Sequence, residues 1–114
     1  MSWTPPEHEG VRDKLAFDCD DQVRAGVVIA SLLAEYPEVW VRRTRRGFHV
    51  VVDAPHDLLK RREIGDCYGR LYGDYKRRKI GLPLNIIFFY KNKRFVSKWV
   101  RVKPVEVDEN GLSS

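Results

Sequence analysis

The pattern of hydrophobic and polar positions in the first half of the chain predicts a strand, a helix and a hairpin. Residues 14–20 can form a short strand, after which Asp20 or Asp21 can cap a helix. Tyr36-Pro37 is expected to end that helix, because proline cannot continue it. Two runs rich in β-branched residues follow, separated by a turn at 44–47, which is typical of a β-hairpin. The predicted elements are a strand at 14–20, a helix at 22–36 and hairpin strands at 39–43 and 48–53.

The helix at 22–36 carries apolar side chains at helical spacing, which indicates the face that packs on a sheet. This face is expected to consist of Val23, Val27, Ala30 and Ala34, with Ile29 and Leu33 beside them. Side chains on a strand alternate between its two faces, so Leu15, Phe17 and Cys19 form the matching apolar set. Together the two sets predict one hydrophobic core between helix and sheet.

The second half of the chain predicts two short helices and a second hairpin. Asp57 and Asp66 can cap these helices, and Gly65 separates them. The second helix carries three tyrosines, Tyr68, Tyr72 and Tyr75, which are expected to pack against the sheet. A near-continuous apolar run then predicts a central strand. The predicted elements are helices at 58–64 and 67–79 and strands at 84–90 and 94–103, with a turn at 91–93.

The order of these elements, βαββ(αα)ββ, predicts an α+β fold. Such an order favours one mostly antiparallel sheet with helices packed on one face. The other face is then expected to be open. We expect a single domain over residues 1–114, with an irregular arm at 1–12 and a frayed acidic tail at 105–114.

Composition narrows the class of protein. A hydrophobic content of 43% is enough for one core, and no apolar run reaches the length of about 18 residues that a membrane span needs. Two cysteines are too few for a disulfide framework or a thiolate zinc site. The first residues carry no basic and apolar leader pattern, so we expect a cytoplasmic protein without a membrane partner. Composition leaves the oligomeric state open.

The net charge of +5 is concentrated in one part of the chain. Residues 42–103 hold eighteen basic and five acidic side chains, whereas the segments on either side are acidic. A segment this basic is expected to bind a polyanion, either nucleic acid or nucleotides, although a solubilising shell is the alternative. The candidate nucleic-acid-binding residues are Arg42, Arg43, Arg45, Arg46, Lys91, Lys93 and Arg94.

The sheet face opposite the predicted core collects residues with functional chemistry. Alternation puts Asp18 and Asp20 on this face of the first strand and His49 on the same face of the hairpin, together with Arg42 and Asp53. Two carboxylates at positions i and i+2 of a strand suit Mg²⁺ or Mn²⁺, and histidine and arginine suit phosphate. The alternative is that the aspartates end a strand and cap a helix, and that His49 packs in the core.

Two short motifs resemble those of the archaeo-eukaryotic primase–polymerase superfamily. Phe17-Asp18-Cys19-Asp20 is similar to its strand motif, and Gly47-Phe48-His49 is similar to the motif on its return strand. The resemblance covers residues 14–53. It implies that Asp18 and Asp20 bind divalent metal and that His49 contacts the phosphates of an incoming nucleotide. A second stretch, Gly65-Asp66-Cys67-Tyr68-Gly69-Arg70 with Asp74 and Arg77, resembles small archaeal and mobile-element proteins.

The chain departs from the superfamily in its third carboxylate. Members carry this residue on a later strand, but neither 84–90 nor 94–103 contains one. Asp53, Asp66 and Asp74 are the substitutes that the sequence offers. The resemblance is therefore compatible with an active nucleotidyltransferase or with a remnant that kept the scaffold and lost the chemistry.

Three functions follow as expectations. The first is a nucleic-acid-associated protein with a primase–polymerase-like core, with Asp18, Asp20 and His49 as the catalytic set and Mg²⁺ or Mn²⁺ at Asp18 and Asp20. The second is a non-catalytic nucleic-acid-binding module. The third is a structural or assembly protein of an archaeal virus or plasmid, which pairs through an exposed strand edge. Dependence on metal separates the first from the others.

Overall fold

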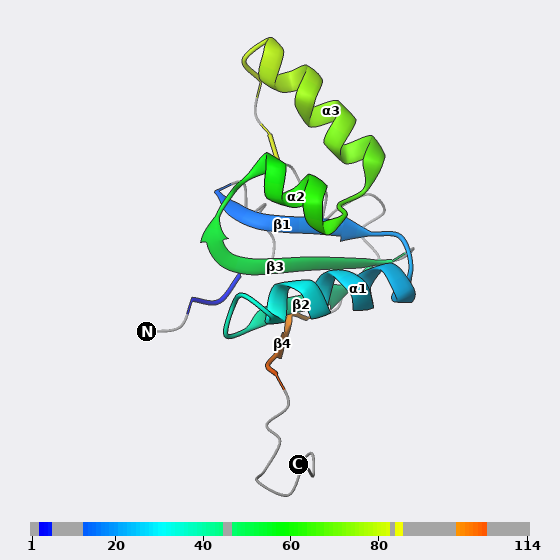
Figure 1. Ribbon diagram of the computed structural model, residues 1–114, viewed down its shortest axis with the longest axis vertical. Coiled ribbons are helices and arrows are strands. Elements are labelled where there is room, and N and C mark those ends of the chain that lie inside the picture. The colour runs from blue at the N-terminus through cyan, green and yellow to red at the C-terminus, as the bar shows by residue number, and fades with distance from the viewer. Residues whose placement is uncertain (1–2, 6–12, 45–46, 83, 86–97, 105–114) are drawn as a thin grey trace, which may run out of the picture.

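The described part of the chain folds into three helices and a four-stranded antiparallel sheet, which confirms the α+β class (Figure 1). The structure is a computed structural model that describes residues 3–5, 13–44, 47–82, 84–85 and 98–104. The elements are β1 (Lys14–Cys19), α1 (Gln22–Leu33), β2 (Val39–Arg43), β3 (Phe48–Pro55), α2 (Leu58–Ile64), α3 (Tyr68–Lys79) and β4 (Val100–Val102). Helix α1 ends three residues before the predicted end at Tyr36. The described part contains no helix that is long and apolar enough to cross a membrane.

The strands lie in the order β1-β3-β2-β4, and every neighbouring pair is antiparallel. The predicted hairpin forms between β2 and β3, with Val41 opposite Val50. Of the strand predicted at 84–90, only Leu84 and Asn85 are described, and neither is in a strand. The strand predicted at 94–103 is described from residue 98, and its paired part is β4. The predicted tail at 105–114 and most of the predicted arm at 1–12 lie outside the described residues.

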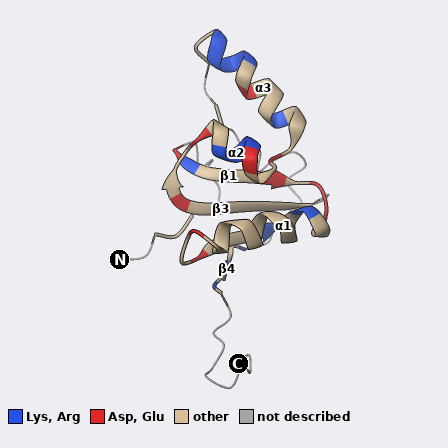
Figure 2. Ribbon diagram, in the orientation of Figure 1, with Lys and Arg blue, Asp and Glu red and all other residues tan. Residues whose placement is uncertain are grey.

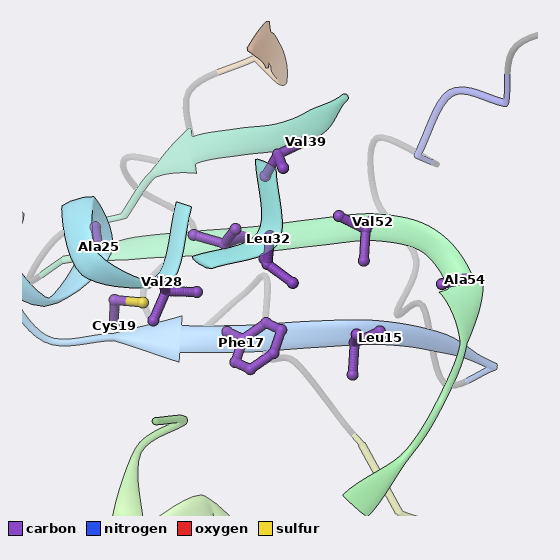
Figure 3. Packing of buried hydrophobic residues seen from close by; sticks show 10 residues of the cluster. Leu15, Phe17, Cys19, Ala25, Val28, Leu32, Val39, Val52 and Ala54 are labelled. Carbon is purple, nitrogen blue, oxygen red and sulfur yellow. The ribbon is translucent and has the colours of Figure 1, made fainter. Parts of the chain in front are cut away.

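The main core lies between α1 and one face of the sheet. In Figure 3, Val28 and Leu32 of α1 lie near Phe17 and Cys19 of β1. The prediction that Val23, Val27, Ala30 and Ala34 face the sheet is wrong: all four are exposed, and Val23 is 78% exposed. The stretch from Ala25 to Ala34 contains no charged residue, so both sides of the helix satisfy an apolar pattern. The buried side carries Val28 and Leu32, with Ile29 partly buried beside them, and these side chains remove more apolar surface from water than Ala30 and Ala34 could.

Helices α2 and α3 lie between β3 and β4 in the sequence but differ in how they pack. Leu58 and Ile64 of α2 are buried or partly buried, and Lys60 pairs with Glu35 at 2.5 Å beside α1. Gly65 has φ 115°, a left-handed conformation that favours glycine, and it turns the chain from α2 into α3. Helix α3 packs on α2 and projects away from the sheet (Figure 1). Because of this projection, Tyr68 and Tyr72 do not pack against the sheet as predicted, and both are exposed.

The second face of the sheet, expected to be open, is covered. Ala16 and Val51 lie at its centre and are fully buried. Trp3 and Trp99 pack against them from outside the sheet. The prediction of an open face is therefore wrong at the centre of the sheet, where Trp3 and Trp99 pack against Ala16 and Val51. Strand alternation alone cannot show that this part of the face is covered.

Candidate functional site

Three polar side chains form one row across the covered face of the sheet. In the strand register, Asp18 of β1 lies opposite His49 of β3, and His49 lies opposite Arg42 of β2. Directly opposed residues project to the same face, so the predicted shared face of Asp18 and His49 is confirmed. The atoms approach closely: His49 Nε2 lies 3.8 Å from Asp18 Oδ1, and Arg42 Nε donates a hydrogen bond of 3.0 Å to His49 Nδ1. We call these three residues the polar row.

The polar row holds a neutral histidine between two charged groups. Burial, together with the charges of Arg42 and Arg70, lowers the pKa of His49 to about 3. Burial also lowers the pKa of Arg42 to about 10, so this guanidinium stays protonated at neutral pH. Because His49 Nδ1 accepts the bond from Arg42, the single ring proton is on Nε2. The row therefore presents an N–H donor towards the carboxylate of Asp18.

Burial differs sharply along the row. Arg42 is 2% exposed and His49 is 4% exposed, whereas the side chain of Asp18 is 42% exposed. The Trp99 ring lies over the Arg42 guanidinium, 4.3 Å from ring centroid to Cζ. Arg42 is thus a buried residue beneath an indole ring, which leaves almost none of it exposed for contact with nucleic acid. Arg43 is exposed, and the other five candidates, Arg45, Arg46, Lys91, Lys93 and Arg94, lie outside the described residues.

The second aspartate of the predicted pair lies beyond the strand. β1 ends at Cys19, and Asp20 is the exposed first residue of the bend that leads to α1. Strand alternation therefore does not determine where its side chain points. Asp21 accepts the Arg24 N–H at 2.8 Å and is the N-cap of α1, so the predicted cap is the second of the two aspartates proposed.

The first residue of Gly47-Phe48-His49 has to be small, because the backbone at the end of β1 lies close to it. A Cβ at this position would lie 1.9 Å from the carbonyl oxygen of Cys19 and 2.9 Å from the carbonyl carbon of Asp20. No side chain fits such a gap, because real Cβ contacts are longer than 3.0 Å. The glycine thus lets the start of β3 approach the end of β1, where the acidic motif lies.

Asp18 and Asp20 supply only part of the ligand set that a divalent cation requires. Asp18 and Asp20 supply carboxylate oxygens, which Mg²⁺ and Mn²⁺ prefer, but such ions take about six ligands. Among the residues that the structure describes, no group of three or more His, Cys, Asp or Glu side chains could hold a metal ion. The pair therefore fits a cation only as part of a ligand set that phosphate oxygens and water complete.

The three substitutes for a third carboxylate are engaged elsewhere. Asp53 binds Lys14 Nζ at 2.6 Å, and Asp74 binds Arg61 Nη1 at 2.6 Å. Asp66 comes next to Asp18, whose backbone N–H it accepts at 2.9 Å. Its carboxylate is nevertheless held by two arginines, so it is not a free ligand.

A polar network that sequence analysis did not identify lies along the outer edge of β1, where no other strand of the described residues pairs. Every second residue of an edge strand has outward backbone groups without a partner strand. Here Asp66 accepts the N–H of Asp18, Arg70 donates to the carbonyl of Ala16 at 2.8 Å, and Asn85 donates to the carbonyl of Lys14 at 2.6 Å. Three side chains thus satisfy outward backbone groups of Lys14, Ala16 and Asp18.

The edge network continues inwards as a set of buried charges. Arg61 Nε donates to Asp66 at 2.7 Å, and the side chains of Arg61, Asp66 and Asp74 are fully buried. Burial alone would raise the pKa of Asp74, but hydrogen bonds from Arg61 and from the Asn85 N–H outweigh it and hold the pKa below its usual value. We define the edge network as Arg61, Asp66, Arg70, Asp74 and Asn85.

One signal in the sequence could have revealed part of this network. Asp66, Arg70, Asp74 and Arg77 are spaced four, four and three residues apart, which puts alternating charges on one side of a helix. Asp66 was expected to cap the helix at 67–79, but the N-cap is Cys67, which makes no side-chain cap bond. Asp66 serves the edge of β1 instead.

Comparisons with protein-family models, with curated proteins and with solved structures found no match. The functional argument therefore depends on the residues themselves. What they bring together is a carboxylate, a neutral histidine and a protonated arginine on adjacent strands, beside the edge network. Chemically, this set can donate one hydrogen bond to an anion and offer a carboxylate to a cation.

Proposed function

We propose that this protein is nucleic-acid-associated and binds nucleotide phosphates, together with a divalent cation, at Asp18, Asp20 and His49. The observation that carries the proposal is the position of Asp18 directly opposite His49 on adjacent strands, with Nε2 and Oδ1 3.8 Å apart. The resemblance to primase–polymerase motifs requires these two side chains to be neighbours. The net charge of +5 favours the same kind of partner.

Each residue of the row has a role in this proposal. His49 carries its proton on Nε2 and can donate it in a hydrogen bond to a phosphate oxygen. Arg42 fixes this tautomer and adds positive charge behind the ring without touching the ligand. Asp18 and Asp20 would hold Mg²⁺ or Mn²⁺, which when bound neutralises triphosphate charge and orients the phosphates. Because the acidic pair is an incomplete ligand set, cation and nucleotide should bind more tightly together than apart.

Titration calorimetry with a nucleoside triphosphate, with and without Mn²⁺, tests this coupling. In the wild type, Mn²⁺ should tighten triphosphate binding by about 5- to 150-fold, the usual range for coupled ligands. Asp18→Asn should abolish the coupling. Asp13→Asn is the matched control, because it removes the same charge from an exposed position just before β1, and it should keep the coupling. Identical titration curves for all three proteins, with and without Mn²⁺, would refute the proposal.

A non-catalytic nucleic-acid-binding module is the second candidate, favoured by the burial of the row. His49 and Arg42 are nearly inaccessible, which is the usual state of residues that stabilise a sheet rather than bind a substrate. In that case the titrations show no Mn²⁺ coupling, yet the protein binds nucleic acid with an affinity that falls steeply between about 50 and 200 mM salt. Absence of nucleic-acid binding even at about 50 mM salt would remove this second candidate, whereas the triphosphate titrations decide the first.

A further inference from the structure

Helix α3 presents one face to solvent that combines tyrosines and lysines. Tyr68, Tyr72, Lys76 and Lys79 follow one another at intervals of four, four and three residues, which puts them on the same side of the helix. All four are exposed, and Tyr68 is 77% exposed. The opposite side carries Leu71 and Asp74, which are buried. We call the exposed set the tyrosine–lysine face.

The side chains of this face are ordered among themselves. The rings of Tyr68 and Tyr72 are stacked, with centroids 6.1 Å apart and planes inclined by 12°. Lys76 Nζ lies 4.5 Å from the centroid of Tyr72, so a cation covers that ring. The outermost member of the stack is Tyr68, and a large aromatic ring this exposed is a candidate contact surface.

The charge of α3 favours an anionic partner. Its last turn consists of Lys76, Arg77, Arg78 and Lys79, visible as the blue end of the helix farthest from the sheet (Figure 2). The single acidic residue of α3 is Asp74, which is buried against Arg61. The tyrosine–lysine face therefore carries positive charge and no negative charge.

The helix is also held firmly enough to present this face. Asp74 bonds Arg61 of α2 at 2.6 Å and Arg77 at 3.1 Å, and Arg70 donates to the carbonyl of Ala16 in β1. These bonds lie on the side of α3 that points to the body of the protein. A ligand on the opposite side would meet a helix whose orientation is already set, which lowers the ordering cost of binding.

We propose that the tyrosine–lysine face binds single-stranded nucleic acid, with a base stacked on Tyr68 and phosphates paired with Lys76 and Lys79. This inference rests on the proposed association with nucleic acid and identifies a surface for it outside the polar row. A single strand is favoured over a duplex because aromatic rings stack on unpaired bases. Of the side chains that commonly read base edges in a duplex groove, this face offers lysine but no arginine, asparagine or glutamine.

Fluorescence anisotropy tests the proposal with three labelled probes: a 15-nucleotide single-stranded DNA of mixed sequence, the RNA of the same sequence, and a DNA hairpin duplex. The wild type should bind the single strands more tightly than the duplex. Tyr68→Ala should weaken single-strand binding about 5- to 150-fold, which corresponds to the loss of one base–aromatic stack. Tyr68→Phe keeps the ring and should bind as the wild type does. Circular dichroism and urea unfolding of Tyr68→Ala should be unchanged, since the side chain is exposed.

The salt dependence supplies a second, independent measurement. Lys76→Gln should lower the slope of log Kd against log salt by about 0.7, the value for one phosphate contact on a single strand. Arg62→Gln is the matched control, because it removes an exposed positive charge from α2 and should leave the slope unchanged. If Tyr68→Ala and Lys76→Gln both bind DNA and RNA as the wild type does, the inference is overturned. If Tyr68→Ala weakens the binding of only the DNA or only the RNA, the inference is supported and that nucleic acid is identified as the ligand.

The outcome can be separated from that of the proposed function. Tyr68→Ala should leave the coupling between Mn²⁺ and triphosphate unchanged, because α3 contributes no residue to the polar row. A wild type that couples Mn²⁺ to triphosphate but binds neither strand would overturn this inference alone. Strand binding that depends on Tyr68, without any triphosphate binding, would support this inference and refute the metal site.

Discussion

Removal of Arg61 should destabilise the protein more than any exposed substitution, because this residue joins both carboxylates of the edge network. Its side chain is fully buried, with Nε 2.7 Å from Asp66 and Nη1 2.6 Å from Asp74. Arg61→Met keeps the aliphatic volume and removes the charge. Asp66 then keeps its bond from Arg70, and Asp74 keeps Arg77 and the Asn85 N–H, but both carboxylates stay buried with less compensation.

The expected cost is about 3–5 kcal/mol, the usual effect of removing one partner from a buried ion pair. A domain of this size is stable by only about 5–15 kcal/mol, so Arg61→Met should lose a large share of its stability. Urea unfolding at pH 7, followed by circular dichroism, measures the change. Arg62→Met is the matched control: it alters the exposed neighbour on α2, and its effect should be within about 0.5 kcal/mol.

The dependence of this loss on pH identifies its electrostatic origin. Asp74 has a lowered pKa, so its bonds stabilise the native state above the ordinary value of 3.8, and this stabilisation is lost as the pH falls through the native pKa. Without Arg61, that pKa should rise and the contribution should shrink. The difference in unfolding free energy between wild type and Arg61→Met should therefore narrow below about pH 4. Equal stabilities of Arg61→Met and Arg62→Met at pH 7 would refute the assignment of Arg61 as the centre of the network.

Two further predictions concern the sheet and its polar row. Gly47→Ala should destabilise the protein by several kcal/mol, because its Cβ would lie 1.9 Å from the carbonyl oxygen of Cys19. Gly26→Ala in α1 meets nothing within 4 Å and should stabilise the protein by about 0.5–1 kcal/mol. Thermal unfolding measures both variants, and equal shifts in their melting temperatures would contradict the close approach at Gly47. Burial and the charges of Arg42 and Arg70 lower the pKa of His49 to about 3, so between pH 6.5 and 3 the unfolded chain binds a proton at this residue that the native state does not. This residue should therefore make the wild type less stable as the pH falls through that range. His49→Gln, measured in metal-free buffer, should show a shallower slope of stability against pH, and parallel slopes would mean that the native histidine is protonated.

Alternation and local capping signals were sufficient for much of the fold. The hairpin strand at 39–43 and the helix at 58–64 have the predicted bounds, and the other described elements differ by one to three residues at their ends, apart from the last strand. Parity along β1 and β3 was enough to predict that Asp18 and His49 share a face. These features depend on the period of a single element, or on the pairing of two strands that a short turn connects, and such information is local in the sequence.

Other features required the tertiary structure, because they depend on which surfaces meet. Helix α1 is apolar on both sides, so only its docking on the sheet decided that Val28 is buried and Val23 is exposed. The burial of His49 depends on covering groups that are distant in sequence, as the Trp99 ring over its partner Arg42 illustrates.

The edge network is the clearest example of a feature that local sequence patterns cannot predict. The charge spacing in α3 is readable from the sequence, but the bond from Asn85 to the carbonyl of Lys14 joins residues 71 positions apart. Nothing in the local pattern around Asn85 indicates a partner on β1. The composition of α3 determined that it would be basic and aromatic, whereas its projection from α2 decided that Tyr68 faces solvent instead of the sheet. The sequence determines which side chains α3 carries, but the exposure of each side chain depends on how the helix packs. The candidate binding face of α3 exists because that packing leaves Tyr68 in solvent.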